Sequence, residues 1–368
     1  MPAGAPETTT RGAIPCSSIP GFSLPHHGHL EPMVGRRVKM PRMVRFYETG
    51  GPNVLRVEDT IKYPRKGEAL LKVEAIGLNR ADSMFMHGRF FERTRLPASV
   101  GYEAAGVVKE VGPEVDPSWK GKRVSVIPTF SLNEYSTAGE EIVVPVHALA
   151  EYPAALSAAE AAAIWMQYLT AYGTIVELGH LEREEFVFVT AASSSAGLAA
   201  IETIKAEGGR SIAVTRKRDK RDELMALGAN YVIVSEEEDI EQRIAQITGL
   251  KGVRIILDAV AGPLLPALAN VAAPGGIIVE YGALAEHPTF FPQLPVLSKR
   301  LTIRGYWLAE TMTDPTRRDA ATTYVFDHLK DGSFHPRIAK IFPFAQIIEA
   351  YKYLESNTQI GKVVVSVS

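Results

Sequence analysis

A turn of small residues at positions 191–197 separates a short apolar run from a stretch of helical composition. The run at 186–190 (FVFVT) is typical of a strand, and the stretch at 198–207 (LAAIETIKAE) is typical of a helix that ends at Gly208. A second strand is expected at 211–215. A strand, turn, helix and strand in this order can place a pyrophosphate at a helix N-terminus, where backbone amides bind anions.

The chemistry of the turn depends on its small side chains. Ser193, Ser194 and Ser195 stand where turns of this kind commonly carry glycine, and Gly197 remains. Serine hydroxyls can donate hydrogen bonds to phosphate oxygens, and small side chains let the backbone approach them. The alternative is a strand–helix–strand unit that binds no nucleotide.

Basic residues follow the second strand, in the segment TRKR at 215–218. An acidic residue at this point would bind a ribose 2′-hydroxyl, whereas cations favour a 2′-phosphate. The unit therefore indicates NADPH as the cofactor and hydride transfer as the chemistry. Lys220 and Arg221 extend the run, and a charge run is also typical of a solvated face, so that alternative stays open.

Composition limits the remaining classes of protein. The chain has 368 residues, enough for two domains, with 46% hydrophobic and 22% charged residues, as in ordinary globular proteins. A net charge of -2 gives no reason to expect nucleic acid as a partner, and no apolar run is long enough to span a membrane. The single cysteine, Cys16, excludes an intrachain disulfide and a cysteine-rich zinc site. We expect a cytoplasmic protein.

The first 40 residues differ from the rest of the chain. They are rich in Pro, Gly, Ser and Thr and show neither a helical nor a strand period, which predicts a disordered extension. We expect this segment to be dispensable or to reflect an upstream start codon. Its small histidine cluster (His26, His27 and His29) is expected to lie in a solvated loop rather than to bind a metal.

Two patterns of elements follow this extension. Short alternating strands between residues 43 and 146 predict a compact β-barrel. A helix is expected from Ser157, which begins a capping box that Glu160 closes. From 186 to 305 strands alternate with helices, which predicts a doubly wound parallel sheet, and the tail then returns to the first pattern. The expected domains are a barrel formed by 41–165 and 310–368, and a cofactor domain formed by 166–309.

Several short motifs resemble those of the medium-chain dehydrogenase/reductase superfamily, from about Met43 to the end of the chain. They are AIGLNRAD at 75–82, GYEAAG at 101–106, GKRV at 121–124, YLTAY at 168–172, the turn at 191–197 and QIGK at 359–362. The resemblance implies an α/β fold in which a GroES-like β-barrel catalytic domain lies beside a Rossmann cofactor domain. It also implies an active site in the cleft between the two.

The superfamily has one branch with a catalytic zinc and one branch without it. The zinc branch uses a Cys, a His and a second Cys as ligands, and the matching positions here are Asn79, Tyr102 and Met166. None of these is an ordinary zinc ligand, so we expect no metal. The similarity is therefore to the zinc-free quinone oxidoreductase and enoyl reductase branch. Its members transfer hydride from NADPH to a quinone or an activated C=C bond.

Three residues are the catalytic candidates that the resemblance implies. The Asn79 amide could donate to a substrate carbonyl or to the cofactor ribose, Asp82 could anchor a polar network, and the Tyr102 hydroxyl could donate a proton or hydrogen bond. Each has a structural alternative: a turn residue for Asn79, a helix N-cap for Asp82 and a packing residue for Tyr102. Gln167 and Tyr168 are expected either to line the cleft or to pack between the domains.

The resemblance also implies a set of cofactor contacts. Those at the pyrophosphate are Ser194, Ser195, Ala196 and Gly197. Those at the 2′-phosphate are Thr215, Arg216 and Lys217, and Tyr231 matches a position near the adenine ribose. The contacts expected after later strands are Ala259, Gly262, Gly282, Ala283 and Leu284. Lys362 is expected near the nicotinamide end of the cofactor.

The expected partners are a small-molecule quinone or enone and a second copy of the chain. The bulky residues Phe290, Phe291, Leu294 and Trp307 resemble a segment that crosses to a partner subunit, which predicts a homodimer. Two alternatives to a free-standing reductase stay open. One is a non-enzymatic, cofactor-binding protein of the ζ-crystallin-like kind, and the other is an enoyl reductase that acts in trans in a biosynthetic pathway.

Overall fold

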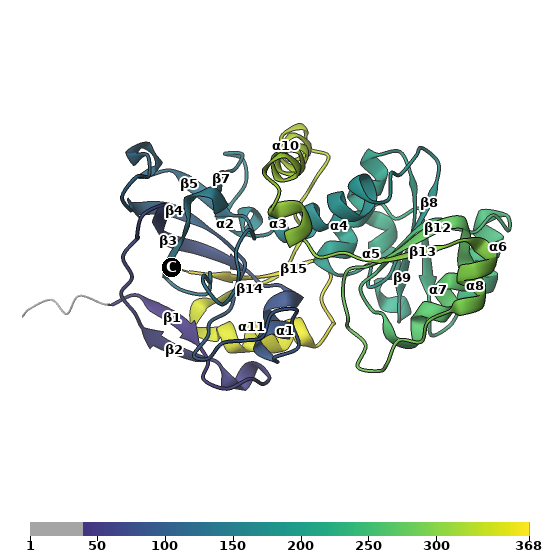
Figure 1. Cartoon of the computed structure of the whole chain (residues 1–368), viewed down its shortest axis with the longest axis horizontal. Coiled ribbons are helices and arrows are strands. Elements are labelled where there is room, and N and C mark those ends of the chain that lie inside the picture. Colours follow the sequence, from purple (N-terminus) through teal and green to yellow (C-terminus); the bar gives the residue numbers. More distant parts are fainter. Residues whose placement is uncertain (1–39, 368) are drawn as a thin grey trace, which may run out of the picture. The chain divides into compact units, whose positions relative to one another are not determined.

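The structure is a computed structural model that describes residues 40–367. The predicted extension at 1–40, with its histidine cluster and Cys16, lies outside the described residues except for Met40. Two main sheets occupy the described range, and Figure 1 shows them as separate groups of arrows with helices between them. No helix in this range is both long enough and apolar enough to cross a membrane.

The first sheet combines strands from both ends of the described range. Its strands are β3 (Glu68–Gly77), β4 (Glu103–Val111), β5 (Arg123–Val126), β6 (Glu141–Pro145), β7 (Leu149–Glu151), β14 (Ile338–Pro343) and β15 (Lys362–Ser366). They follow the order β14-β15-β3-β4-β5-β7, and β6 also pairs with β3. All pairs are antiparallel except β14 with β15. The last strand of the chain therefore pairs directly with β3. A separate antiparallel pair precedes this sheet: β1 (Arg42–Arg45) and β2 (Arg56–Asp59).

The second sheet is parallel throughout. Its strands are β8 (Phe186–Val189), β9 (Arg210–Thr215), β10 (Tyr231–Val234), β11 (Val253–Asp258), β12 (Ala272–Glu280) and β13 (Thr302–Gly305). Their order is β10-β9-β8-β11-β12-β13, so the direction of winding reverses between β8 and β11. Ligands of such sheets bind at the carboxyl ends of the strands beside this reversal. The predicted doubly wound parallel sheet is confirmed.

Helices connect the strands and cover the sheets. They are α1 (Arg80–Met86), α2 (Ala158–Ala161), α3 (Trp165–Ala171), α4 (Ser195–Ala206), α5 (Arg221–Ala226), α6 (Ile240–Thr248), α7 (Leu265–Val271), α8 (Gln293–Lys299), α9 (Ala309–Met312), α10 (Pro315–Asp331) and α11 (Ile347–Glu355). The capping box predicted at Ser157 begins α2: its Oγ accepts from Glu160 N at 3.3 Å, and its N–H donates to Glu160 Oε2 at 2.8 Å.

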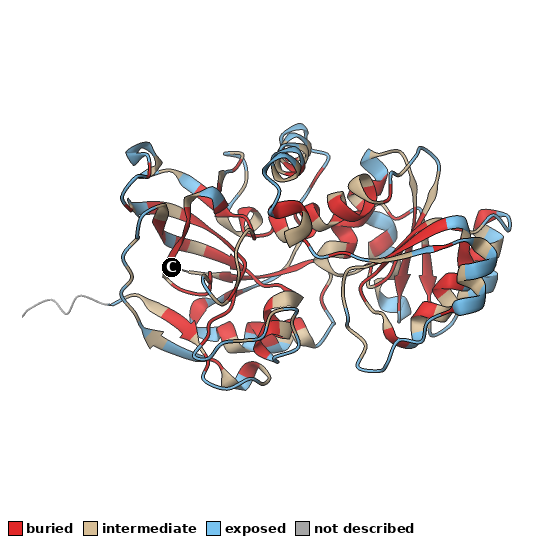
Figure 2. Ribbon diagram, in the orientation of Figure 1, coloured by how far each residue is buried: buried red, intermediate tan, exposed pale blue. Residues whose placement is uncertain are grey.

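Burial explains why the strand before the small-residue turn is apolar along its whole length. Val187, Phe188 and Val189 have no exposed surface. The two valines pack in one core cluster and Phe188 packs in another, so helices cover both faces of the parallel sheet (Figure 2). A strand that is buried on both faces needs a continuous apolar run rather than an alternating one.

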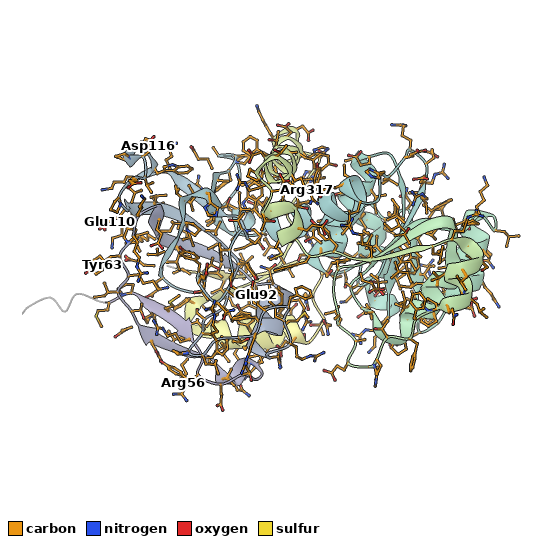
Figure 3. The ribbon with its side chains drawn as sticks, in the orientation of Figure 1. Arg56, Tyr63, Glu92, Glu110, Asp116 and Arg317 are labelled. Atoms are coloured by element: carbon orange, nitrogen blue, oxygen red, sulfur yellow. The ribbon has the colours of Figure 1, made fainter. Side chains whose placement is uncertain are left out.

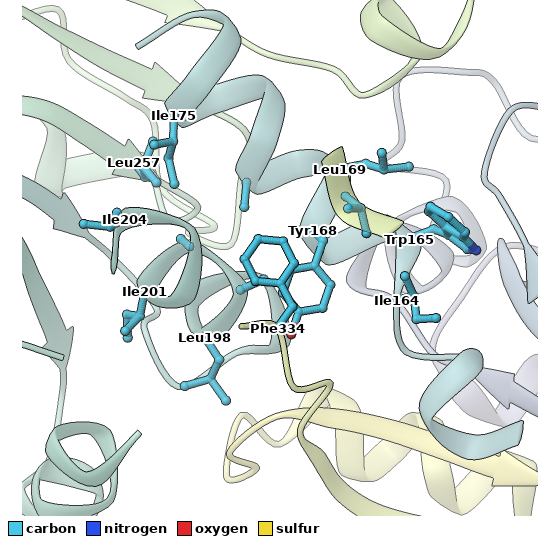
Figure 4. Close-up of a cluster of buried hydrophobic side chains, with 14 of the residues drawn as sticks. Ile164, Trp165, Tyr168, Leu169, Ile175, Leu198, Ile201, Ile204, Leu257 and Phe334 are labelled. Atoms are coloured by element: carbon cyan, nitrogen blue, oxygen red, sulfur yellow. The ribbon is translucent and has the colours of Figure 1, made fainter. Parts of the chain in front are cut away.

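Aromatic packing and ion pairs hold α10 and its neighbours against α3. The ring of Tyr168 stacks on Phe334 at 4.5 Å between centroids, and Figure 4 shows this pair inside the core cluster. Arg317, labelled in Figure 3, pairs with Glu177 in the helical turn after α3 and with Glu310 on α9. These contacts fix the helices that lie between the two sheets.

A buried carboxyl group ends β12. Neither oxygen of Glu280 has a hydrogen-bond partner among residues 40–367. Burial, and to a smaller extent the neighbouring Asp258, raises the pKa of Glu280 to about 8. The folded protein therefore keeps a proton that the unfolded chain releases at about pH 4. The free energy of unfolding is expected to fall as the pH rises between these two values, because the unfolded state binds fewer protons there.

We expect Glu280→Gln to raise the free energy of unfolding by ~1–3 kcal/mol at pH 8.5, because it removes the buried charge, and to change it less at pH 5. Urea unfolding of both proteins at the two pH values measures the difference. Glu236→Gln, at an exposed position, is the matched control. An equal effect of Glu280→Gln at both pH values would contradict the role given to the buried charge.

Candidate functional site

A cavity of about 1130 Å³ lies along the carboxyl ends of the parallel strands. The segments that follow β8, β9, β11 and β12 line one part of it. Asn79, Tyr102 and Lys362, from the first sheet and the loop after β3, line another part. Most of the cofactor and catalytic candidates of the sequence therefore share one cavity, at the place where ligands of doubly wound sheets bind.

The small-residue turn meets the cavity through Ser194, Ser195 and Ala196. Ser194 is the N-cap of α4, and its Oγ accepts from Gly197 N at 3.1 Å, which leaves the hydroxyl proton free to donate. Gly197 does not line the cavity. A Cβ at this position would lie 2.6 Å from the Cα and O of Ala192, so glycine lets α4 approach the preceding turn.

Cationic side chains line the cavity after β9. Arg216 and Lys217, which the resemblance assigns to a 2′-phosphate, belong to the lining together with Thr215. Lys220 also lines the cavity, and its Nζ donates to Ser193 Oγ at 3.1 Å and to two carbonyl oxygens near the end of the chain. Arg218 differs, because its guanidinium pairs with Glu237 and it is not part of the lining.

Among the remaining cofactor candidates, five line the cavity: Ala259, Gly282, Ala283, Leu284 and Lys362. The structure corrects two others. Tyr231 begins β10, and its ring packs 6.3 Å from that of Phe186, which begins β8. Both rings thus lie at the amino edge of the parallel sheet, opposite the carboxyl ends that line the cavity. Gly262 lies behind the cavity wall, where its N–H donates to Thr289 Oγ1 at 2.8 Å.

A buried ion pair supports the part of the cavity formed by the first sheet. Lys362 Nζ pairs with Glu103 Oε2, and each side chain is only 1% exposed. The ammonium also donates to Asn79 Oδ1 at 2.6 Å, while Asn79 Nδ2 donates to Glu103 Oε2 at 3.0 Å and to Gly77 O at 3.2 Å. Glu103 Oε1 accepts from Met166 N at 2.9 Å. These bonds join β3, β4, α3 and β15 at one point.

The arrangement corrects the role that the resemblance implies for Asn79. An amide has two N–H donors, and both are used by Glu103 and Gly77. The orientation of the amide follows from its neighbours, because its oxygen faces an ammonium and its nitrogen faces two acceptors. Asn79 therefore has no N–H left for a substrate carbonyl or a ribose.

Lys362 is tied to the small-residue turn at 191–197 through the residue before it. Gly361 N donates to Ser193 O at 3.0 Å, and a bridge pairs Gly361 with Ser194. Gly361 has φ +104, and a Cβ there would lie 2.5 Å from Arg337 O, so the position requires glycine. The backbone of Lys362 thus lies next to the turn, and the ammonium at the end of its side chain lies beside Asn79.

Asp82 acts behind this cluster rather than in the cavity. It is fully buried, does not line the cavity, and its Oδ2 accepts from Asn79 N at 2.9 Å at the start of α1. It is the third residue of the helix and not its N-cap, which is Asn79. Burial raises the pKa of Asp82 to about 7. The polar network predicted for Asp82 exists, but it supports the backbone of Asn79.

Tyr102 lines the cavity within a group of aromatic rings. Its ring lies 6.2 Å from that of Phe90 and 5.8 Å from that of Phe130, and both neighbours also line the cavity. Its hydroxyl makes no hydrogen bond within the described part of the chain. Burial raises the pKa of Tyr102 well above its ordinary value, so the hydroxyl keeps its proton and is a hydrogen-bond donor.

The two residues that begin the helix between the sheets have different surroundings. Gln167 lines the cavity, is 2% exposed, and its Oε1 has no partner among residues 40–367. Tyr168 is not part of the lining, and its hydroxyl donates to Glu202 beneath the stacked Phe334. Of the two, only Gln167 can meet a ligand.

Two family models match the chain. The model described as "Alcohol dehydrogenase GroES-like domain" matches residues 65–170, and the one described as "Zinc-binding dehydrogenase" matches residues 196–323. A quinone oxidoreductase-like protein 2 homolog of Nematostella vectensis is 29% identical over 335 residues, which cover 89% of this chain and 89% of that protein. A quinone oxidoreductase of Lama guanicoe is 27% identical over 331 residues, which cover 89% of this chain and 97% of that protein.

Solved structures agree with these relatives. The crystal structure of Escherichia coli quinone oxidoreductase complexed with NADPH matches with a TM-score of 0.80 and 26% identity, over 88% of this chain and 99% of the other. The chain belongs to the medium-chain dehydrogenase/reductase superfamily, in its quinone oxidoreductase-like branch. This membership makes it an oxidoreductase and confirms the predicted GroES-like and Rossmann domains, while the predicted domain limits stay a prediction.

Sequence reasoning missed two charged residues of this superfamily member. Glu103 carried a signal, because it is the one acidic residue in the motif GYEAAG, whose other positions suit a buried strand. A buried charge requires a partner, but the sequence does not show that the partner comes 259 positions later. Lys220 belongs to a run of basic residues in the sequence, and this pattern does not show that Lys220 lines the cavity while Arg218 does not.

We expect Lys362→Met to lower the free energy of unfolding by about 3 kcal/mol, because it leaves the Glu103 carboxylate buried without its partner. Glu103→Gln combined with Lys362→Met removes both charges and is expected to cost less than half as much. Urea unfolding measures both values. Lys352→Met, which breaks an exposed pair with Glu349, is the control and should change little. A double variant as unstable as the single variant would refute this account of the pair.

Proposed function

We propose that this oxidoreductase is a zinc-independent reductase that uses NADPH and transfers hydride to a quinone or to the C=C bond of an α,β-unsaturated carbonyl compound. The observation that carries the proposal is the polarity of the cavity. Cationic side chains after β9 and aromatic side chains around Tyr102 line the same space. Cations suit the phosphates of a dinucleotide, and aromatic rings suit a planar, uncharged acceptor.

The residues present fit a dinucleotide phosphate. The N-terminus of α4 faces the cavity through a turn whose close approach depends on Gly197. Arg216 and Lys217 provide positive charge for a 2′-phosphate, and the Escherichia coli relative was crystallised with NADPH. The cofactor would supply the hydride, and the protein would supply its binding and orientation.

The residues at the zinc-ligand positions do not fit a metal ion. Asn79 uses its whole carboxamide within the buried cluster, and Tyr102 and Met166 offer neither an imidazole nor a thiolate. No group of three or more His, Cys, Asp or Glu side chains within residues 40–367 is arranged to hold a metal. Hydride addition to a conjugated acceptor needs no metal, because the negative charge moves to an oxygen that hydrogen-bond donors can stabilise.

Tyr102 is the donor that the cavity offers for that oxygen. Its side chain lines the cavity beside Phe90 and Phe130, and its hydroxyl, which burial keeps protonated, makes no hydrogen bond to a described residue. A donor in a largely apolar space stabilises developing negative charge more than it would in water. In this proposal the rings hold the acceptor flat and Tyr102 binds its carbonyl oxygen.

The proposal includes a homodimer in the cytoplasm. β13 is the edge strand of the parallel sheet, so it can pair with a second copy. Phe290, Phe291 and Leu294, in the preceding segment, are at least 64% exposed, which a partner subunit would cover. The cytoplasmic location stays a prediction.

The cationic residues determine which cofactor is preferred. We expect Arg216→Ala combined with Lys217→Ala to weaken NADPH binding at least ~10-fold more than NADH binding, because charge-assisted bonds to a phosphate are lost. Titration of intrinsic fluorescence with each nucleotide measures this. Arg218→Ala is the matched control, because its guanidinium is paired with Glu237 outside the cavity. An equal loss for both nucleotides would show that Arg216 and Lys217 form only a solvated surface.

Turnover tests the function itself. We expect the purified protein to consume NADPH, followed at 340 nm, with a quinone or an enone but not with a simple ketone. Addition of zinc or a chelator should leave the rate unchanged, because no step uses a metal. Binding of NADPH without turnover of any acceptor, or a rate that a chelator abolishes, would contradict the proposal.

The same assay tests Tyr102. Tyr102→Phe removes the hydroxyl while keeping the ring against Phe90 and Phe130, so turnover of the enone is expected to fall ~10- to 100-fold with little change in NADPH affinity. An unchanged rate would assign Tyr102 to packing.

A further inference from the structure

We propose that a second, smaller pocket of this protein binds a phosphate group through Arg45, Lys62 and Arg95. The pocket has a volume of about 150 Å³ and is lined by β1, by the segment after β2 and by the loops at 95–99 and 132–136. None of its lining residues belongs to the cavity at the carboxyl ends of the parallel strands. The pocket is therefore separate from the site that the proposed function uses.

The lining of this pocket carries more positive than negative charge. Arg45 and Lys62 are half-buried, Arg95 is exposed, and the exposed Glu134 is the one acid among the lining residues. Within residues 40–367 none of the three cations forms an ion pair with a carboxylate. A pocket with this charge attracts an anion.

Neighbouring cations differ in this respect. Arg42, on the same strand as Arg45, pairs with Glu140, and Lys66 pairs with Glu114. The cations around the pocket therefore lack partners in a region where other cations find them.

Lys62 carries its charge at a cost in free energy. Burial, and to a smaller extent repulsion from Arg45, lowers the pKa of Lys62 to about 8, and Glu68 offsets only part of this. The two oxygens of Glu68 already accept from Tyr135 Oη at 2.9 Å and from Arg65 N at 2.8 Å. An anion bound beside Arg45 and Lys62 would offset their repulsion and the lost hydration of the ammonium.

Uncharged groups of the lining complete a site for an oxyanion. Ser136 is 4% exposed, and its hydroxyl makes no hydrogen bond to a described residue, so it is available as a donor. Asn133 holds the segment that carries Arg95: its Oδ1 accepts from Arg95 N at 2.8 Å, and its Nδ2 donates to Arg93 O at 3.2 Å. Arg95 thus extends from a backbone that is fixed beside the pocket.

Size and charge together indicate the class of ligand. Pockets for drug-sized ligands have volumes of roughly 300–1,000 Å³, and this one is smaller, so it suits a single phosphate group rather than a nucleotide. Guanidinium groups such as those of Arg45 and Arg95 match phosphate oxygens in pairs. Free phosphate and the phosphate of a larger ester share this chemistry.

The pocket lies behind one wall of the large cavity. Two loop segments contribute to both spaces: Glu92 and Ser131 line the cavity, whereas Arg95 and Asn133 line the pocket. Ser131 Oγ donates to Glu92, and Asn133 Nδ2 donates to the same carboxylate at 3.2 Å. A phosphate bound to Arg95 would therefore contact the loops that also form the aromatic side of the cavity.

The test is the thermal unfolding midpoint of the full chain at pH 7 as inorganic phosphate replaces chloride at constant ionic strength. We expect Lys62→Met and Arg45→Met each to need ~10-fold more phosphate than the parent for the same rise, because a charge-assisted bond is lost. Lys62→Met keeps most of the apolar stem and removes a repelled charge, so we expect it to fold. Glu134→Gln removes the acid of the lining and should need less phosphate.

Two variants serve as controls. Lys352→Met removes an exposed cation that pairs with Glu349, and it should respond as the parent does. Arg216→Ala combined with Lys217→Ala should also respond as the parent does, because those cations line the other cavity. Phosphate stabilises proteins in general by exclusion from their surface, and that effect is shared by every variant.

A weakened response in Lys62→Met and Arg45→Met, with a full response in both controls, supports the proposal. Glycerol 3-phosphate, used as a second probe, then identifies the source: a lower requirement than for phosphate indicates an ester, and an equal or higher one indicates free phosphate. Equal responses of the parent and all variants, or a loss confined to Arg216→Ala/Lys217→Ala, would overturn the proposal.

Discussion

The ion pair between Lys362 and Glu103 is the interaction on which the candidate site depends. Both side chains are 1% exposed, and an unpaired charge at that depth would destabilise the fold severely. To bring the two together, the last strand of the chain must pair with β3 beside β4, and α3 must begin where Glu103 accepts the N–H of Met166. One buried carboxylate thereby joins the first sheet to the start of α3.

The cavity follows from this junction. The side proposed to bind phosphates consists of loops at the carboxyl ends of parallel strands, where backbone amides, a helix N-terminus and lysine and arginine side chains converge. Its other side consists of aromatic rings carried by loops of the first sheet. Neither sheet provides both properties. An enzyme that joins a charged dinucleotide to an uncharged acceptor needs both, and here the C-terminal strand connects them through Gly361 and Lys362.

Most of the fold could be predicted from local patterns. The apolar run at β8, the turn that ends at Gly197 and the reversal of strand order depend on short-range chemistry and on rules of sheet topology. The cations Arg216 and Lys217 were singled out by their place after a strand, and both line the cavity, while their contact with a cofactor stays a prediction. The contact with the adenine ribose predicted for Tyr231 was wrong, because its position at the start of a strand puts it on the amino edge of the sheet. Asp82 and Gly262 were placed near the cavity but support its wall from behind.

By itself the sequence determined the class of fold, the cofactor-binding unit and the absence of ordinary zinc ligands at the matching positions, because each depends on residue type and local spacing. The tertiary structure decided which groups are free to react. Asn79 has a suitable amide, yet Glu103 and Gly77 use both of its N–H groups. Arg218 and Lys220 look alike in the sequence, yet Arg218 pairs with Glu237, whereas Lys220 lines the cavity and spends its three N–H groups on Ser193 and two carbonyl oxygens. Hydrogen bonds between residues hundreds of positions apart leave no local pattern, so only the folded chain shows which donors remain.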